Sequence, residues 1–417
     1  MKVTWLACLL ALGLTLDLVS ARTISTVKYA VMFDAGSSGT RCKVYKLQTV
    51  HSLRISDVSQ IKVPKPNKAT PGLSFFGDSP SGVGPYLQPL IDAAINAVPS
   101  QYQSQAPVYV FATAGMRLLP DNKRAAVIRA VEQMLSNSSK SPFLFQTGNI
   151  KVISGKDEAI YDWVTVNFLM GVLTGESSTE YGALEMGGAS SQNAFEVPVN
   201  QLHTAILNLR HGTRQLYAHS YLGYGESEAR KKLNRFLVNE MLKKDPNAPS
   251  EFVNPCFNSN FQKMVAVDGR VYFTKGGFHR ATSSECRSLI KKVFFCRDGD
   301  TTRCPFKLQP RLQGKFYSFS VFTYALRDTG VVSTNGQRVS LENIKDVLVN
   351  WCSRPLTVVE LNNPYTPYQC FQLNFIYSML TDGYRVDDSF ELYNGDSIHG
   401  FDLNWALGAT LIALNAL

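Results

Sequence analysis

Two glycine-rich stretches, one in each half of the chain, repeat the same pattern and limit the fold more than any other feature of the sequence. The first is FDAGSSGTR at 33–41 and the second is LEMGGASSQ at 184–192. In each, an apolar run ends in an acidic residue, glycines follow, and small hydroxyl residues come next. Glycine allows tight turns, and successive N–H groups at such a turn bind anions. The repeat predicts two related domains that hold a phosphate chain between them.

The pattern of apolar residues around these turns is that of an α/β protein. The 417 residues exceed the usual size of a single hydrophobic core, so two domains are expected. Strand-like and helix-like segments alternate in the first half, and the alternation restarts near residue 181. The predicted strands are 29–33, 42–47, 107–115, 150–154, 181–188 and 192–199, and the predicted helices are 84–98, 121–135 (capped by Asp121), 157–171 and 226–244.

The first 21 residues are typical of a secretory signal peptide. Lys2 provides the positive end, Trp5–Leu16 the apolar stretch, and Val19-Ser20-Ala21 the cleavage site. This stretch is shorter than the roughly 20 residues that a membrane span needs, although an uncleaved anchor is the alternative. We therefore expect a soluble, secreted protein with no membrane span.

The cysteines indicate an oxidising compartment. Seven remain after the signal, and six of them lie in the second half, whereas Cys42 stands alone and is expected to be free and buried. Nearest-neighbour pairing is one of 15 possible connectivities. It gives Cys256–Cys286, Cys296–Cys304 and Cys352–Cys370. The sequence also contains one N-glycosylation sequon, at Asn137.

The net charge of +9 favours polyanionic ligands such as nucleotides, and it equally fits heparin-like surfaces. No zinc-finger spacing or arginine stripe indicates nucleic acid, so no nucleic-acid partner is expected. We expect a monomer.

Acidic residues at the two turns suit a cation site. Asp34 and Glu185 end equivalent strands, where they can hold a hydrated Mg²⁺ or Ca²⁺ beside a phosphate chain; alone, Asp34 would be read as a turn former. Two further positions stand out, Thr113 in the glycine turn ATAGMR and Glu158 at a helix start. A plain strand-to-helix turn and a capping box are the alternatives for these two.

Five blocks occur in the order found in the apyrases, the ecto-nucleoside triphosphate diphosphohydrolases, and the resemblance covers nearly the whole mature chain. The stretch HSYLGYG (219–225) also resembles one that these enzymes share. The blocks are DAGSSGTR, ATAGMRLL, GKDEAIYDWVTVNFLMG, GALEMGGASSQ and NWALGATL.

The resemblance implies a fold of the actin/sugar-kinase type, with two RNase H-like domains and an active-site cleft between them. The lobes would be 22–160 plus 396–417, and 161–395 with the disulfides. It implies a cation-dependent nucleotidase in which Glu158 is the general base. By the same resemblance, Thr113, Ser190 and Gln192 surround the attacking water, Asp34 and Glu185 hold the waters of Ca²⁺ or Mg²⁺ with Trp405 nearby, and Ser37, Ser38, Gly39, Thr40, Gly188, Ala189 and Ser190 bind the phosphates.

The sequence departs from the family pattern at several positions. Glu185 replaces the usual Asp, and Ala159 and Asp162 replace the usual glycines. For the nucleobase, the resemblance points to Tyr324 and to either Tyr365 or Tyr368, although ordinary structural tyrosines are the alternative.

The leading hypothesis is stepwise hydrolysis of nucleoside tri- and diphosphates of the ATP, ADP, UDP and GDP class, by in-line water attack. The alternatives are a phosphotransferase or exopolyphosphatase of the same superfamily, or a catalytically inactive secreted nucleotide-binding protein. The site of action would be extracellular or, as runner-up, the lumen of the secretory pathway.

Overall fold

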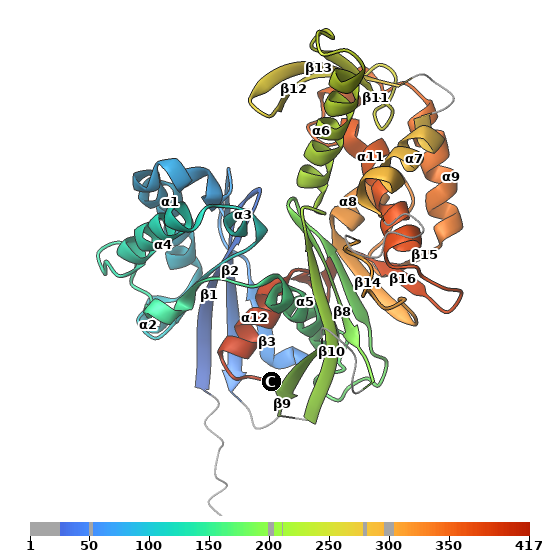
Figure 1. Ribbon diagram of the computed structural model, residues 1–417. Helices are drawn as coiled ribbons and strands as arrows, with labels where there is room; N and C mark the ends of the chain where they lie inside the picture. Colours follow the sequence, from blue (N-terminus) through green and yellow to red (C-terminus); the bar gives the residue numbers. More distant parts are fainter. Residues whose placement is uncertain (1–25, 50–52, 199–203, 211, 278–281, 296–303) are drawn as a thin grey trace, which may run out of the picture.

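A computed structural model describes residues 26–49, 53–198, 204–210, 212–277, 282–295 and 304–417. The chain forms two large mixed sheets, each with helices on its outer side, and two further helices between them (Figure 1). No helix in the described ranges is both long and apolar enough to span a bilayer. The expected signal peptide lies outside the described residues.

The first sheet has the strand order β3-β2-β1-β5-β6, with the short β4 paired to β2. The strands β3, β2 and β1 are antiparallel, whereas β5 and β6 run parallel to β1. Its strands are β1 (Thr26–Gly36), β2 (Gly39–Thr49), β3 (Val58–Ile61), β4 (Lys68–Ala69), β5 (Val108–Ala112) and β6 (Ile150–Val152).

The second sheet has the order β15-β16-β14-β7-β8-β10-β9. Its segment β10-β8-β7-β14-β16 repeats the order and the strand directions of β3-β2-β1-β5-β6. The two halves of the chain therefore share one topology, as their repeated turns predict. The strands are β7 (Gly182–Met186), β8 (Ser190–Glu196), β9 (Thr204–Leu209), β10 (Gly212–Leu222), β14 (Lys315–Ser320), β15 (Gln337–Val339) and β16 (Glu391–Asn394).

The outer helices bury apolar faces against their own sheets. The helices α1 (Val83–Ala97) and α4 (Asp121–Leu135) share a core with β1 and β5. Asp121 is not the N-cap of α4, as the sequence suggested; it is the first helical residue, Pro120 precedes it, and its carboxylate pairs with Arg124. The second sheet packs on α7 (Thr282–Phe294), α8 (Val321–Asp328), α9 (Leu341–Ser353) and α11 (Gln369–Ser378).

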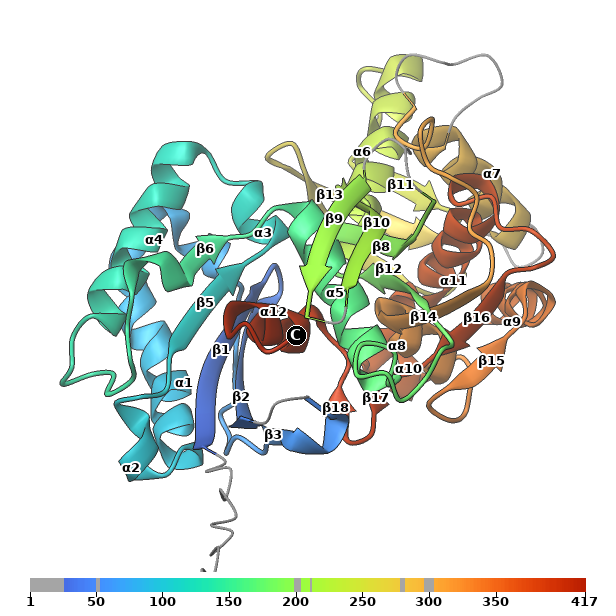
Figure 2. The same ribbon diagram turned by 90° about the horizontal axis from the view of Figure 1, so that it is seen from below.

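Two helices lie between the sheets and pack against each other, α5 (Gly155–Leu169) and α12 (Trp405–Ala413) (Figure 2). The helix α5 contacts β7, β8 and β10 of the second sheet, whereas α12 contacts β1 and β2 of the first. Gly408 makes this close approach feasible, because a Cβ there would lie 2.2 Å from the carbonyl oxygen of Tyr161. The expected lobe boundary at residue 160 lies inside α5, and the lobe boundaries stay a prediction.

A small sheet of β11 (Glu251–Asn254), β12 (Gln262–Val267) and β13 (Arg270–Gly276) follows the long helix α6 (Glu226–Lys244). Next to it lie the Cys256–Cys286 and Cys352–Cys370 disulfides, which confirm two of the expected pairs. The third pair includes Cys296, which lies outside the described residues. Cys42 is free and buried, and burial raises the pKa of its thiol to about 12.

Candidate active site

The first glycine hairpin joins β1 to β2, and Ser37 and Ser38 form its tip. Other loops support it through glycines: a Cβ on Gly72 would lie 2.5 Å from the carbonyl oxygen of Ser37, and one on Gly115 would lie 2.9 Å from the Cα of Ser37. Gly39 and Thr40 are buried beneath the tip, where the N–H group of Thr40 donates to the hydroxyl of Tyr86 (3.1 Å). Ser38, by contrast, is exposed at the tip, where it can meet a ligand.

The second hairpin joins β7 to β8 and rests on the start of α6. The N–H groups of Glu226 and Ser227 donate to the carbonyls of Gly187 and Gly188 (both 2.9 Å). Because the C=O and N–H of a trans peptide point in opposite directions, the N–H groups of Gly188 and Ala189 lie on the other side of the turn. Neither of them donates to an acceptor within the described residues. Free N–H groups of this kind form an anion cradle.

The two hairpins face each other. A Cβ built on Gly188 would lie 2.8 Å from the hydroxyl oxygen of Ser37, so the tip of one hairpin touches the tip of the other. Gly225, the last residue of HSYLGYG, permits the approach of α6, because a Cβ there would lie 2.3 Å from the backbone nitrogen of Ala189. The repeated turns are therefore brought together from opposite lobes.

Glu158 lies in the first turn of α5 and is buried. It does not cap the helix, since the cap is made by Ser154, whose hydroxyl oxygen accepts from the N–H of Asp157 (3.0 Å). The Glu158 carboxylate instead accepts a hydrogen bond from Arg117 of the short helix α3 (Ala114–Arg117) at 2.9 Å. The capping alternative for Glu158 is thereby excluded.

Arg117 links this carboxylate to the second lobe. Its guanidinium also donates to the hydroxyl oxygen of Ser190 (3.2 Å) and to the carbonyl of Ile153 (3.1 Å). Ser190 in turn accepts from the amide of Gln192 (2.7 Å). The expected catalytic residues Glu158, Ser190 and Gln192 therefore form one network, and Arg117, which the sequence analysis did not single out, is its centre.

Burial and mutual repulsion shift the pKa values of the acids in this region. Burial raises the pKa of Glu158, whereas the charge and hydrogen bond of Arg117 lower it. Burial also raises the pKa of Asp34, and Arg41, whose guanidinium lies 3.8 Å from its carboxylate, lowers it. The pKa of Glu185 is raised well above its usual value by burial and then by the negative charge of Glu158.

The acids suit a hydrated cation better than a directly bound one. No three His, Cys, Asp or Glu side chains in the described part of the chain converge closely enough to ligate a metal ion. Yet Asp34, Glu158 and Glu185 are all buried and act on one another electrostatically. Carboxylates spaced in this way can bind the water shell of a hard divalent cation.

Two hydroxyl residues occupy equivalent places at the ends of β5 and β14. Thr113 follows β5, is buried, and its N–H donates to the carbonyl of Ala35 (3.2 Å). Ser320 ends β14 at φ 61°, and the hydrogen bond of its side chain to Glu185 lowers the pKa of that acid. Sequence reasoning identified Thr113 and missed Ser320. Trp405 is buried at the start of α12 and stacks on Phe111, with ring centroids 6.3 Å apart.

The three candidate tyrosines for the nucleobase differ in exposure. Tyr324 on α8 and Tyr365 before α11 are exposed. Tyr368 is buried against Phe257 and Phe261, and the guanidinium of Arg230 covers its ring at 3.9 Å. Tyr368 is therefore a core residue that offers no open face for stacking.

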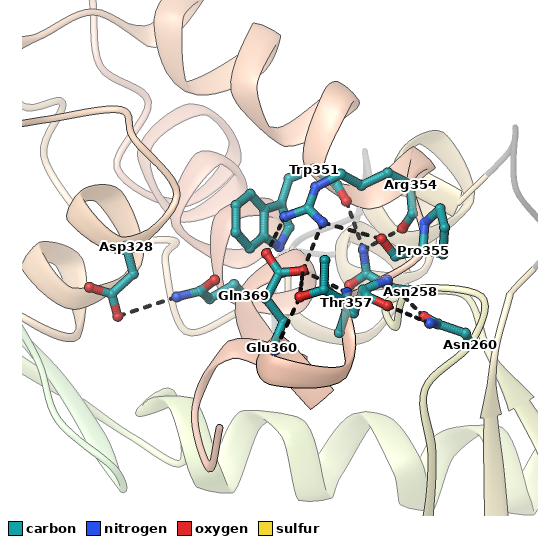
Figure 3. Close-up of polar contacts among 10 residues, drawn as sticks. Asn258, Asn260, Asp328, Trp351, Arg354, Pro355, Thr357, Glu360 and Gln369 are labelled. Atoms are coloured by element: carbon teal, nitrogen blue, oxygen red, sulfur yellow. Dashed lines mark hydrogen bonds and ion pairs between the residues drawn. The ribbon is translucent and has the colours of Figure 1, made fainter. Parts of the chain in front are cut away.

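Polar contacts fix the segment that precedes Tyr365 (Figure 3). The Asn258 side chain donates to the carbonyls of Trp351 (2.7 Å) and Arg354 (3.0 Å), and Arg354 forms a two-point ion pair with Glu360. The loop after Cys256 is thus joined to the chain between α9 and α11. The expected glycosylation residue Asn137 is exposed after α4, and its modification stays a prediction.

Two lobes of one topology that bring glycine hairpins and buried acids together give this chain a fold of the actin/sugar-kinase type. A solved nucleoside triphosphate hydrolase from Neospora caninum has the same fold, with a TM-score of 0.68 and 14% identity over 93% of this chain and 92% of that one. The chain belongs to the GDA1/CD39 (nucleoside phosphatase) family, whose profile matches residues 21–417.

Curated relatives cover most of the chain. It is 30% identical to nucleoside-diphosphatase mig-23 of Caenorhabditis elegans, over 92% of this chain and 76% of that protein. It is also 30% identical to human nucleoside diphosphate phosphatase ENTPD5, over 96% of this chain and 89% of that protein. The guanosine-diphosphatase of Schizosaccharomyces pombe is 29% identical, over 93% and 74%. The family assignment agrees with the order of the five sequence blocks.

Proposed function

We propose that this protein hydrolyses the terminal phosphoanhydride bond of nucleoside diphosphates and triphosphates, releasing phosphate. The observation that carries the proposal is the contact between the two hairpins, Ser37 against Gly188, beside the buried Glu158. This arrangement suits a chain of at least two phosphates, with a carboxylate at one end to activate water. Relatives named as nucleoside-diphosphatases support the same substrate class.

Glu158 is the general base in this proposal. Arg117 donates a hydrogen bond to its carboxylate at 2.9 Å, and its charge lowers the pKa of Glu158 against the effect of burial, which favours the form that can accept a proton from a water molecule. Ser190 and Gln192 lie in the same network, where they orient that water for in-line attack. The free N–H groups of Gly188 and Ala189 stabilise the negative charge on the phosphoryl oxygens. Thr113 and Ser37–Thr40 complete the site from the first lobe.

Asp34 and Glu185 would hold a divalent cation, Ca²⁺ or Mg²⁺, through its water molecules. Both acids are buried, and Glu185 takes part in no ion pair between described residues, so a cation there would supply positive charge that the protein does not. When bound, the cation supplies neutralisation of the phosphate charge. Trp405 contributes an apolar wall on the α12 side.

Tyr324 is our candidate for stacking on the nucleobase, with Tyr365 as the second. Tyr324 is exposed, and the charge of Arg41, the partner of Asp34, acts on its hydroxyl. We further propose that the protein acts in the secretory pathway or outside the cell, since its two disulfides fit an oxidising compartment.

Phosphate release from ATP, ADP, UDP, GDP and AMP, with and without Ca²⁺ or Mg²⁺, tests the activity. We expect release from all except AMP, and loss of release in EDTA. The Glu158→Ala variant should bind nucleotide and lower turnover by about 10²–10⁴-fold. Near-normal turnover of that variant would remove Glu158 from its role, and absence of release from every nucleotide would overturn the proposal.

A further inference from the structure

Asp162 has no partner, although it is among the most deeply buried acids of the protein. Its exposed fraction is 1%, and neither of its carboxylate oxygens accepts a hydrogen bond from any described residue. An unsatisfied buried charge costs several kcal/mol of stability, on the order of that of a broken buried ion pair. Such a group calls for a ligand that the protein alone does not supply.

The position of Asp162 on α5 points to that ligand. It lies four residues after Glu158, one helical turn further along the same face. The charges that act on it most strongly are those of Glu185, Glu158 and Asp34, in that order. Asp162 thus lies on the same face of α5 as Glu158, near enough to the acids of the candidate site for their charges to act on it.

The charges of this group are not balanced within the protein. Four buried carboxylates meet here, of Asp34, Glu158, Asp162 and Glu185. Arg41 pairs with Asp34 and Arg117 pairs with Glu158, whereas Asp162 and Glu185 take part in no ion pair between described residues. Burial and mutual repulsion raise the pKa values of Asp162 and Glu185 in the absence of a positive partner, and a divalent cation would supply one.

We propose that Asp162 is a further carboxylate of the cation site, and that it and Glu185 together hold a hard divalent cation or its water molecules. This inference rests on the proposed function, which places the cation between Asp34 and Glu185 only. A third carboxylate adds negative charge around a hydrated ion and a further acceptor for its water molecules.

Calorimetric titration of the mature protein with CaCl₂ and MgCl₂, without nucleotide, tests the inference. We expect Asp162→Asn to weaken Ca²⁺ binding about 10–100-fold, the cost usually found when a residue that supports a metal's ligands is lost. Glu180→Gln is the matched control, because Glu180 is a partly buried acid that bonds Trp163 beside the same helix and lies outside the site. The control should bind Ca²⁺ like the wild type.

Thermal unfolding in EDTA supplies a second reading that does not depend on activity. Because Asp162→Asn removes an unpaired buried charge, we expect the variant to unfold at a higher temperature than the wild type in EDTA and to gain less from added Ca²⁺. Asp162→Ser serves as the second variant if the Asn variant does not fold.

Each outcome decides one of the two proposals. Unchanged Ca²⁺ affinity in Asp162→Asn, with or without a change in stability, would overturn the role of Asp162, while phosphate release by the wild type would leave the proposed function standing. A wild type that neither binds a cation nor releases phosphate would overturn both. Weaker Ca²⁺ binding together with higher stability in EDTA supports the inference.

Discussion

Replacing Arg117 by methionine should disable Glu158 while leaving the tips of the two hairpins in place. Methionine keeps much of the volume of the side chain but removes its three hydrogen bonds, to Glu158 (2.9 Å), Ile153 (3.1 Å) and Ser190 (3.2 Å). Arg117 is the strongest influence that lowers the pKa of Glu158 against the effect of burial. In the variant, the pKa of Glu158 is therefore higher, and the base is protonated over a wider range of pH.

The expected loss follows from the role of a general base. We expect kcat to fall about 10²–10⁴-fold, the usual contribution of such a group, with little change in KM, because Arg117 does not reach the hairpin tips. A base works only when deprotonated, so a higher pKa moves the acid limb of the kcat profile to higher pH. The loss should be largest at low pH and smaller at high pH.

Phosphate release followed over a range of pH measures this effect, together with chemical unfolding to establish that the variant folds. Breaking a buried ion pair costs up to about 3–5 kcal/mol, and less here because Glu158 can take up a proton. Arg124→Met is the control, since it breaks an exposed pair with Asp121 and should leave kcat unchanged. An Arg117→Met profile with the wild-type acid limb would refute the reasoning, even if its kcat were lower.

Three further predictions concern the second hairpin, the nucleobase and pH. Gly225→Ala should lower the free energy of unfolding in urea by about 1–3 kcal/mol and should raise KM, because the alanine Cβ would lie 2.3 Å from the backbone nitrogen of Ala189. An unchanged KM would contradict this. Tyr324→Ala should lose about 1–3 kcal/mol of stacking with ADP and none with tripolyphosphate, and equal losses would argue against stacking. Burial and the neighbouring Glu196 raise the pKa of Glu180 to about 8. Between about pH 4.5 and 8 the folded state therefore binds one more proton than the unfolded state, and the stability of the protein should fall as pH rises through that range. In Glu180→Gln, the unfolding midpoint should depend less on pH over the same range.

The parts of the fold that local sequence specifies were predictable. Each glycine hairpin is a contiguous stretch, so its acid, turn and hydroxyl residues could be read together, and the shared topology of the sheets confirms the duplicated fold. The place of Glu158 at a helix start next to a strand end was predictable, whereas its role as general base came from the family resemblance and stays a prediction. The two described disulfides agree with nearest-neighbour pairing, which the sequence offered as one of 15 possible connectivities.

Residues whose role depends on packing between distant segments were not predictable in the same way. Arg117 is one residue of the glycine turn ATAGMR in the sequence, and it becomes central only because α3 brings it beside Glu158 of α5 and beside Ser190. Ser320 lacks the neighbouring glycines that draw attention to Thr113. The signal that could have identified it is its place at the end of β14, the strand that corresponds to β5 in the first sheet. Tyr368 looked like Tyr365 in sequence, but the small β11–β13 sheet brings Phe257 and Phe261 against it.

In the proposed function, the pseudo-symmetry of the two halves is broken where hydrolysis requires it. The proposed binding residues occur in pairs, Asp34 with Glu185 and Thr113 with Ser320, whereas the helices between the sheets begin differently. The first turn of α5 carries Glu158, while α12 begins with Trp405. In-line attack brings water to the terminal phosphate from one side only, and the leaving group departs on the other. A carboxylate in place of Trp405 would add negative charge where the phosphates bind and would provide no second base, so duplication can supply the cradle but only one half can supply the chemistry.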